Sequence, residues 1–316
     1  MKNFYLATAA LLLAITGQSQ LLHSIKKPGS TELSYLYGTI HLGDSVLLSW
    51  DDTFLDAFYS CDVMVGEIDF INENTDMSAS LMEALTKSML QPTEIKANAD
   101  TVKLIHDILS TEFDSTVADG LVEMTPFWAM LLTEQMRKIK KSNFEDTLII
   151  EEESPVEIID TNYYAPIDLT LQYMALEDSM GVAGLETMQS QVDLITNLGN
   201  EVTWAIYYDY LKGSWGMNLL GSSPATDDIR EVYLKQNLDS ILSFFASPEL
   251  SAEFMELAFN NRNESMRKGM IEMMSDHRSY FFAVGAGHLV GESGLINQLI
   301  KSGYIVTPVP FTFTKL

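Results

Sequence analysis

Two segments near opposite ends of the chain share a pattern that could carry chemistry. Residues 35–45 read YLYGTIHLGDS, and residues 282–293 read FAVGAGHLVGES. Each has an apolar run, then Gly-x-x-His-Leu, then a glycine, an acid and a serine, with Val290 as one extra residue in the second copy. With 18 Gly and five His, two Gly-x-x-His matches arise by chance in about 3% of such chains. The pair predicts an internal duplication of a strand, a tight glycine turn and a histidine at the strand's end.

The histidines of the two units, His41 and His288, are the first candidates for a functional site. In an open α/β sheet, ligands gather outside the carboxyl ends of the strands, and a glycine lets the backbone approach a ligand closely. We therefore expect the two histidines to face one crevice. A neutral imidazole is a common metal ligand and also a general base near neutral pH. The alternative is that both histidines only make hydrogen bonds within the sheet.

An acidic residue follows another apolar run between the two copies. Residues 62–68 read DVMVGEI and predict a buried strand, after which Glu67 and Asp69 would share a face. An acid at the end of a buried strand is costly unless it is paired or binds a cation. We expect His41, Glu67 and His288 to be three metal ligands that leave a position open for water, with a salt bridge from Glu67 as the alternative. Nitrogen and oxygen ligands suit manganese, cobalt or zinc and do not choose among them.

The elements that would position these residues follow from hydrophobic periodicity and from breaker residues. Strands are expected at 21–26, 34–39, 62–68, 182–185, 279–284 and 304–309. Helices are expected at 50–59, 77–90, 101–109, 126–139, 167–178, 187–198, 202–211, 227–245, 249–274 and 292–301. The acidic stretch at 145–160 is read as a solvated loop or a short strand insertion. Since strands cluster at both ends, we predict an α/β fold: a central mixed sheet from both terminal parts of the chain, covered by helices, with a helical middle region.

The N-terminus has the layout of a secretory signal peptide. Lys2 precedes an apolar run at 4–15, and Gly17 and Ser19 supply small residues before a cleavage site that would leave Gln20 first. We predict a signal peptide at 1–19, a single domain at 20–316, and export to the periplasm or beyond. An uncleaved anchor is the alternative. Since no later run reaches ~18 apolar residues, we expect no stable membrane insertion after cleavage.

Composition excludes several classes of protein. The 316 residues include 19 Lys+Arg and 44 Asp+Glu, for a net charge of −25. So acidic a chain argues against nucleic acid as a partner and against docking on anionic lipid. The hydrophobic share of 47% excludes a disordered chain, and the single cysteine, Cys61, excludes a disulfide framework and a Cys-rich zinc site.

Together these segments resemble the TraB/GumN family, which is related to the Tiki metalloproteases. The resemblance extends over about 21–310. Besides the two Gly-x-x-His units, it rests on VGEID at 65–69, GLET at 184–187, the pair Arg262-Asn263, and a closing Gly-Tyr-x-Val at 303–306. Each segment alone is weak, but the ordered set is specific.

The resemblance implies a sheet-centred fold in which both Gly-x-x-His units form one active site, with a more distant relation to erythromycin-esterase-like and ChaN-like folds. For the Tiki members it implies a metal-dependent peptidase that uses manganese or cobalt. Two further residues are candidate catalytic groups. Glu186, after a predicted strand, would be a fourth ligand or the general base, or only a favourable acid at a helix N-terminus. Arg262 would hold an oxyanion or a substrate carboxylate, or only form a salt bridge with Glu67 or Glu186.

We therefore predict an exported metal-dependent hydrolase, a peptidase that acts on a peptide or protein substrate. Two alternatives come from other classes. One is a non-catalytic protein that sequesters a peptide or haem through the same crevice, and the other is a metal-independent hydrolase that uses His and Glu on an ester.

Overall fold

The computed structural model describes residues 20–72, 99–141, 164–191, 193–194, 204–212, 225–245 and 255–315. The predicted signal peptide at 1–19, the helix expected at 77–90 and the acidic stretch at 145–160 lie outside these residues. Among the helices of the described part, none is long and apolar enough to cross a membrane.

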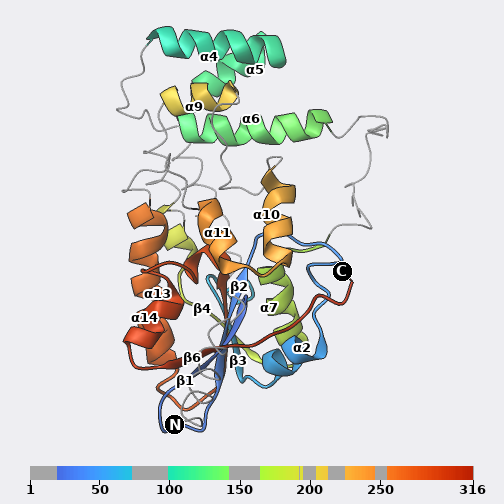
Figure 1. The fold of residues 1–316 in the computed structure, drawn as a ribbon. Coiled ribbons are helices and arrows are strands. Elements are labelled where there is room, and N and C mark those ends of the chain that lie inside the picture. Colours follow the sequence, from blue (N-terminus) through green and yellow to red (C-terminus); the bar gives the residue numbers. More distant parts are fainter. Residues whose placement is uncertain are drawn as a thin grey trace, which may run out of the picture.

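A six-stranded mixed sheet forms the centre of the molecule (Figure 1). Its order is β4-β3-β5-β2-β1-β6. Strands β4, β3, β5 and β2 are parallel to one another, whereas β1 is antiparallel to both β2 and β6. The strands are β1 (Leu22–Lys26), β2 (Ser34–Thr39), β3 (Val63–Gly66), β4 (Gly181–Gly184), β5 (Tyr280–Gly285) and β6 (Ile305–Pro308). This confirms a mixed sheet drawn mainly from both ends of the chain, with β4 added at one edge from the middle.

Helices cover both faces of the sheet. In Figure 1, α13 (Asn261–Met273) and α14 (Leu295–Lys301) lie on one side, and α2 (Asp52–Tyr59) and α7 (Ile167–Glu177) on the other. Strand β5 is buried from Tyr280 to Val284, as a parallel strand covered on both faces must be. Its Phe281 ring packs edge-on against Phe54 and Phe58 of α2, with centroids 5.5 and 5.0 Å apart.

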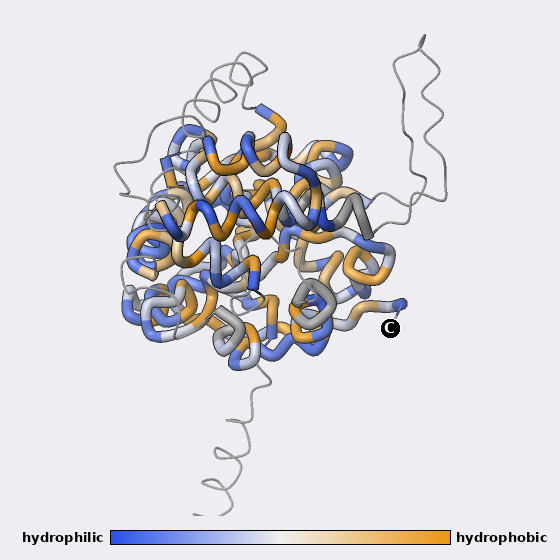
Figure 2. The backbone as a smooth tube through the Cα atoms, turned by 90° about the horizontal axis from the view of Figure 1, so that it is seen from above, coloured by the Kyte–Doolittle hydropathy of each residue, from blue (hydrophilic) through white to orange (hydrophobic). Residues whose placement is uncertain are grey.

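A second hydrophobic core lies within the helical middle region. It joins α4 (Ala99–Glu112), α5 (Ser115–Val122), α6 (Pro126–Lys141) and α9 (Trp204–Leu211), at the top of Figure 1. The colouring of Figure 2 shows helices in which hydrophilic and hydrophobic residues alternate, as amphipathic helices around a core require. The sheet and these helices are therefore stabilised by separate apolar clusters.

The helices of the structure differ from the predicted helices at three places. Helix α5 was not expected; Asp114 caps it by accepting a hydrogen bond from the Val117 backbone N–H at 2.9 Å. The helix expected at 227–245 is two helices, α10 (Ala225–Leu234) and α11 (Leu238–Phe245). Between them Gln236 takes a φ of +52°, and its side chain donates to the Phe311 carbonyl at 2.9 Å. A π-helical segment, η2 (Glu256–Asn260), directly precedes α13 inside the helix expected at 249–274.

Candidate active site

The two Gly-x-x-His units lie side by side at the carboxyl ends of β2 and β5. These strands are parallel neighbours, with Gly38 opposite Val284 and Thr39 opposite Gly285. A Cβ atom on Gly38 would lie 3.0 Å from the Cα atom of Ala286, so a larger residue would press the two units apart. The predicted adjacency of the units is confirmed, and the first glycine is what allows their close packing.

His288 is buried in the second unit and is oriented by Asn263 of α13. Its Nδ1 lies 2.7 Å from Asn263 Oδ1, and the amide nitrogen of Asn263 donates to the Ser293 carbonyl at 3.0 Å. Since the amide oxygen therefore faces the ring, Nδ1 carries the proton and Nε2 keeps its lone pair. Burial lowers the pKa of His288 to about 4, which keeps the ring neutral at neutral pH.

Glu67 follows β3 and lies directly against His288. Its Oε1 accepts a hydrogen bond from the Gly285 backbone N–H at 2.7 Å, and its Oε2 accepts one from Arg262 at 2.6 Å. Burial opposes the charged carboxylate, but the neighbouring cationic charge and the Gly285 hydrogen bond outweigh it and lower the pKa of Glu67. Gly285, the glycine of the second motif, thus serves as a donor to the acid.

Arg262 of α13 joins Glu67 to Glu186. Its Nε donates to Glu186 Oε1 at 2.9 Å and its Nη2 to Glu186 Oε2 at 2.7 Å, while Nη2 also reaches Glu67. The three side chains are 9 to 16% exposed. Gln191 donates to the same Glu186 carboxylate. Of the alternatives for Arg262, the observed geometry is the salt bridge, which binds both acids at once.

His41 stands apart from this cluster and is held by a residue that the sequence did not suggest. Its Nδ1 lies 2.6 Å from Oδ2 of Asp168, in the first turn of α7. The hydrogen bond to this carboxylate raises the pKa of His41. The His41 side chain is 73% exposed, against 13% for Asp168. The two duplicated histidines thus differ, one buried beside an amide and the other exposed beside a carboxylate.

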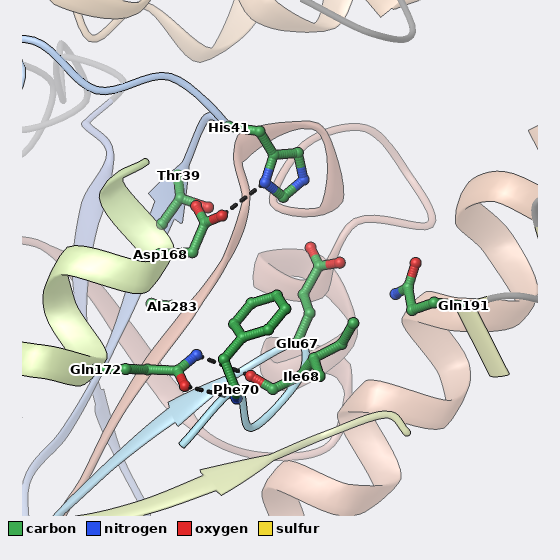
Figure 3. Close-up of a pocket in the computed structure, with 9 residues that line it drawn as sticks. All are labelled: Thr39, His41, Glu67, Ile68, Phe70, Asp168, Gln172, Gln191 and Ala283. Atoms are coloured by element: carbon green, nitrogen blue, oxygen red, sulfur yellow. Dashed lines mark hydrogen bonds and ion pairs between the residues drawn. The ribbon is translucent and has the colours of Figure 1, made fainter. Parts of the chain in front are cut away.

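A small cavity lies beside His41 and Glu67 (Figure 3). Its volume is about 60 Å³, and the His41 ring and the Glu67 carboxylate point into it. His288 is not among the residues that line it, so the structure does not show both histidines facing one crevice. Ile68, Phe70, Ala283 and Thr39 add apolar surface to the lining, which also includes Asp168, Gln172 and Gln191. Gln172 of α7 was not expected either. Its amide nitrogen donates to the Ile68 carbonyl and its oxygen accepts from the Phe70 N–H, both at 2.8 Å, so it fixes the turn that follows Glu67.

Asp69 does not join Glu67 at the site. Strand β3 ends at Gly66, so the two-residue alternation no longer applies at position 69. The Asp69 carboxylate instead accepts hydrogen bonds from the backbone N–H groups of Ile71 and Asn72, at 3.0 and 2.8 Å. It stabilises the turn, and its predicted shared face with Glu67 is wrong.

Two of the three predicted metal ligands have a separation that fits a common metal ion. His288 Nε2 lies 3.7 Å from Glu67 Oε1, which is too long for a hydrogen bond. Two tetrahedral ligands with bonds of about 2.1 Å lie about 3.4 Å apart. Among the residues that the structure describes, however, no group of three or more His, Cys, Asp or Glu side chains is arranged to hold a metal ion. His41 therefore does not complete the pair in this arrangement.

The charge of the site also favours a cation. Glu67, Glu186 and Asp168 are three mostly buried carboxylates, and Arg262 is the guanidinium that faces the first two. With His41 protonated, as its raised pKa implies, and His288 neutral, these groups leave a local charge of −1. Burying uncompensated charge is costly, so a divalent cation beside Glu67 would relieve it.

Comparison with known proteins gives one family match and several relatives. The model of the TraB/PrgY/gumN family matches residues 21–308. The chain is 20% identical over 323 residues to the metalloprotease TIKI1 of Danio rerio, a match that covers 88% of this chain and 61% of that protein. A shorter segment is 37% identical over 70 residues to the metalloprotease TIKI2 of Xenopus tropicalis. Another is 42% identical over 55 residues to a metalloprotease TIKI homolog of Amphimedon queenslandica. They cover 21% and 17% of this chain, and 13% and 11% of those proteins. No solved structure matches the chain.

Proposed function

We propose that this chain, which belongs to the TraB/PrgY/gumN family, is a metal-dependent hydrolase that cleaves peptide bonds in a peptide or protein substrate. The relatives named metalloproteases support the reaction class. The chain spans 61% of the length of the Danio rerio relative. The activity of that whole protein is therefore not carried over, and the proposal rests on the residues of this chain.

The observation that carries the proposal is the pair formed by His288 and Glu67. The free Nε2 of one lies 3.7 Å from Oε1 of the other, at the carboxyl ends of two neighbouring parallel strands. We propose that these two side chains hold the metal and that His41 supplies a third ligand from the facing wall of the cavity. A metal bound there would lower the pKa of a bound water and polarise a substrate carbonyl. The ligand set admits manganese, cobalt or zinc.

The surrounding residues hold these ligands in the required state. Asn263 keeps the proton of His288 on Nδ1, which leaves Nε2 free. Arg262 and the Gly285 N–H keep Glu67 charged and oriented. Glu186 in turn holds the Arg262 guanidinium in place. Direct catalytic roles for Glu186 and Arg262 stay predictions. An oxyanion that binds Arg262 would have to lie beside Glu67 and Glu186, the two carboxylates that already accept hydrogen bonds from it.

Peptide cleavage by metal-stripped and reconstituted protein tests the function. We expect a peptide library to be cleaved after manganese, cobalt or zinc is added, and not in excess chelator. His288→Ala and Glu67→Gln should lose cleavage while remaining folded. His106→Ala is the matched control, because His106 lies on α4 and pairs with Asp119. Full activity of His288→Ala or Glu67→Gln would contradict the proposed site.

One observation favours a second candidate, a metal-independent hydrolase. The His41–Asp168 contact at 2.6 Å is the arrangement by which a carboxylate orients a histidine general base. Cleavage of an ester or peptide that persists in chelator and is lost in His41→Ala would support this function instead.

Export is part of the proposed function. It rests on the sequence of residues 1–19, with Lys2, the apolar run and Ser19 before the cleavage site. We expect the protein recovered from outside the cytoplasm to begin at Gln20 by N-terminal sequencing. Protein that keeps Met1 and stays in the cytoplasm would contradict export.

A further inference from the structure

The Asp168 side chain is mostly buried and has one polar partner among the described residues. Its Oδ2 lies 2.6 Å from His41 Nδ1. Its Oδ1 is buried and has no hydrogen-bond partner in the part of the chain that the structure describes. A buried carboxylate is costly unless its partners compensate for the lost hydration. The contact with His41 is the side-chain interaction that compensates this carboxylate among the described residues.

The first Gly-x-x-His unit also fixes the helix that carries Asp168. The backbone N–H of Ile167 donates to the carbonyl of Leu42 at 3.1 Å, so α7 begins against the residue that follows His41. A Cβ atom on Gly43 would lie 2.0 Å from the Ala165 carbonyl oxygen, so only glycine lets the chain before α7 pass here. The Leu-Gly pair after His41 thus docks α7 and brings Asp168 to the ring.

We propose that Asp168 is a positioning residue for the proposed reaction: it fixes the His41 ring with Nδ1–H toward itself and Nε2 toward the cavity. The role of Asp168 in metal binding rests on the proposed function, whereas its orientation of the His41 ring rests on the observed contact alone. The first turn of α7 suits the carboxylate, since the helix dipole stabilises negative charge there. A carboxylate that accepts from the other ring nitrogen of a metal-binding histidine also raises the basicity of that ligand.

The second unit shows what is specific to Asp168. There Asn263, from α13, orients His288 through a neutral amide oxygen. The duplicated histidines thus have orienting partners from different helices and of different charge. The carboxylate belongs to the exposed histidine, where water competes for Nδ1 and an anionic acceptor holds the ring more strongly than an amide.

The first arm of the test uses metal-free protein and needs no activity. Nitrogen-15 labelling of histidine reports which ring nitrogen carries the proton, and His41→Ala assigns the signal among the five histidines. At a pH above the raised pKa of His41, which is about 9, the ring is neutral, and we expect its one proton to lie on Nδ1 in the wild type and in Glu177→Gln, a control at the far end of α7. In Asp168→Ala the proton should move largely to Nε2. A proton that stays on Nδ1 in Asp168→Ala overturns the proposal.

The second arm measures metal affinity by calorimetry with manganese, cobalt or zinc alone. Loss of an orienting partner of a metal-binding histidine lowers affinity by about 10- to 100-fold. We expect this loss in Asp168→Ala, no change in Glu177→Gln, and a smaller loss in Asp168→Asn, whose amide oxygen still accepts from Nδ1. Unchanged affinity in folded Asp168→Ala and Asp168→Asn, when His41→Ala weakens binding, overturns the positioning role. Absence of binding in the wild type would overturn the metal-dependent function, and the first arm would still decide whether Asp168 fixes His41.

Discussion

At the scale of single residues, Arg262 compensates two mostly buried acids, Glu67 and Glu186. Removal of one partner from a buried ion pair leaves an uncompensated charge and costs about 3–5 kcal/mol. We expect Arg262→Met to lower the free energy of unfolding by about 3 kcal/mol at neutral pH, measured by urea denaturation. Arg278→Met is the control, since Arg278 pairs with Asp276 at an exposed site and should change stability little. Equal effects of the two substitutions would contradict the compensation.

His23 gives the fold a pH dependence of its own. It lies in β1, is 4% exposed, and burial lowers its pKa from 6.5 to about 4. Below pH 6.5 the unfolded chain binds a proton that the folded chain does not bind until about pH 4. The free energy of unfolding therefore falls as pH falls through this window, by about 3 kcal/mol from this residue.

Replacement of His23 by Phe should flatten that dependence. We expect the decline in unfolding free energy between pH 6.5 and 4 to be shallower in His23→Phe than in the wild type, measured by urea denaturation across pH. Ser24→Ala, at the next residue of β1, removes no titratable group and should leave the decline unchanged. An identical slope in His23→Phe and wild type would contradict the assigned burial effect.

The sequence identified most residues of the candidate site, including Arg262 and Asn263, but not Asp168, the partner that orients His41. His288, Glu67, Glu186 and Arg262 form one contact chain, and each could be named from its motif or its position after a predicted strand. Asp168 could not be named. It lies 127 residues from His41, in the first turn of a helix where an acid has an ordinary explanation.

At the scale of elements, Gly43 and Gly120 form a matched pair of glycines. A Cβ atom on Gly43 would lie 2.0 Å from the Ala165 carbonyl oxygen, while one on Gly120, within α5, would meet nothing within 4 Å. We expect Gly43→Ala to destabilise the protein by about 1–3 kcal/mol, because α7 must shift. Gly120→Ala should be neutral or stabilising by up to about 1 kcal/mol, since alanine favours a helix.

Both variants can be compared by thermal and urea unfolding. The metal-free histidine spectrum adds a local readout, because displacement of α7 in Gly43→Ala should also disturb the His41 signal. If Gly43→Ala is as stable as Gly120→Ala and leaves the His41 signal unchanged, the docking of α7 on the first unit is wrong.

Elements with a strong local signal were predictable, and those set by distant contacts were not. The six strands and α2 follow from apolar periodicity and turn residues. The break between α10 and α11 contains no glycine or proline from which it could be predicted. It depends on Gln236, whose side chain bonds to the Phe311 carbonyl of the C-terminal segment. The break matters for the site because Tyr233 of α10 donates to the Gly38 carbonyl at 2.7 Å.

At the scale of the whole molecule, the chain carries a net charge of −25. Repulsion among like charges destabilises a compact state, and salt screens it over about 10 Å at 0.1 M. We therefore expect the melting temperature of the purified protein to rise by a few degrees between low salt and about 0.3 M NaCl. A constant or falling melting temperature would show that attractive ion pairs outweigh the repulsion.

The family membership and the α/β class could be inferred from the order of short motifs along the chain, since the family match extends over residues 21–308. The separate core of α4, α5, α6 and α9 could not, because helical periodicity shows that a face is buried without showing what it is buried against. The more distant relation to erythromycin-esterase-like and ChaN-like folds stays a prediction, as no solved structure matches the chain.

Calorimetric titration of the metal-stripped protein with manganese, cobalt and zinc tests the central claim most directly. The claim is that Glu67 and His288, 3.7 Å apart, hold a divalent cation. We predict one tight site in the wild type and in His106→Ala, and loss of that site in Glu67→Gln and in His288→Ala. No binding by the wild type, or full binding by folded Glu67→Gln and His288→Ala, would contradict it.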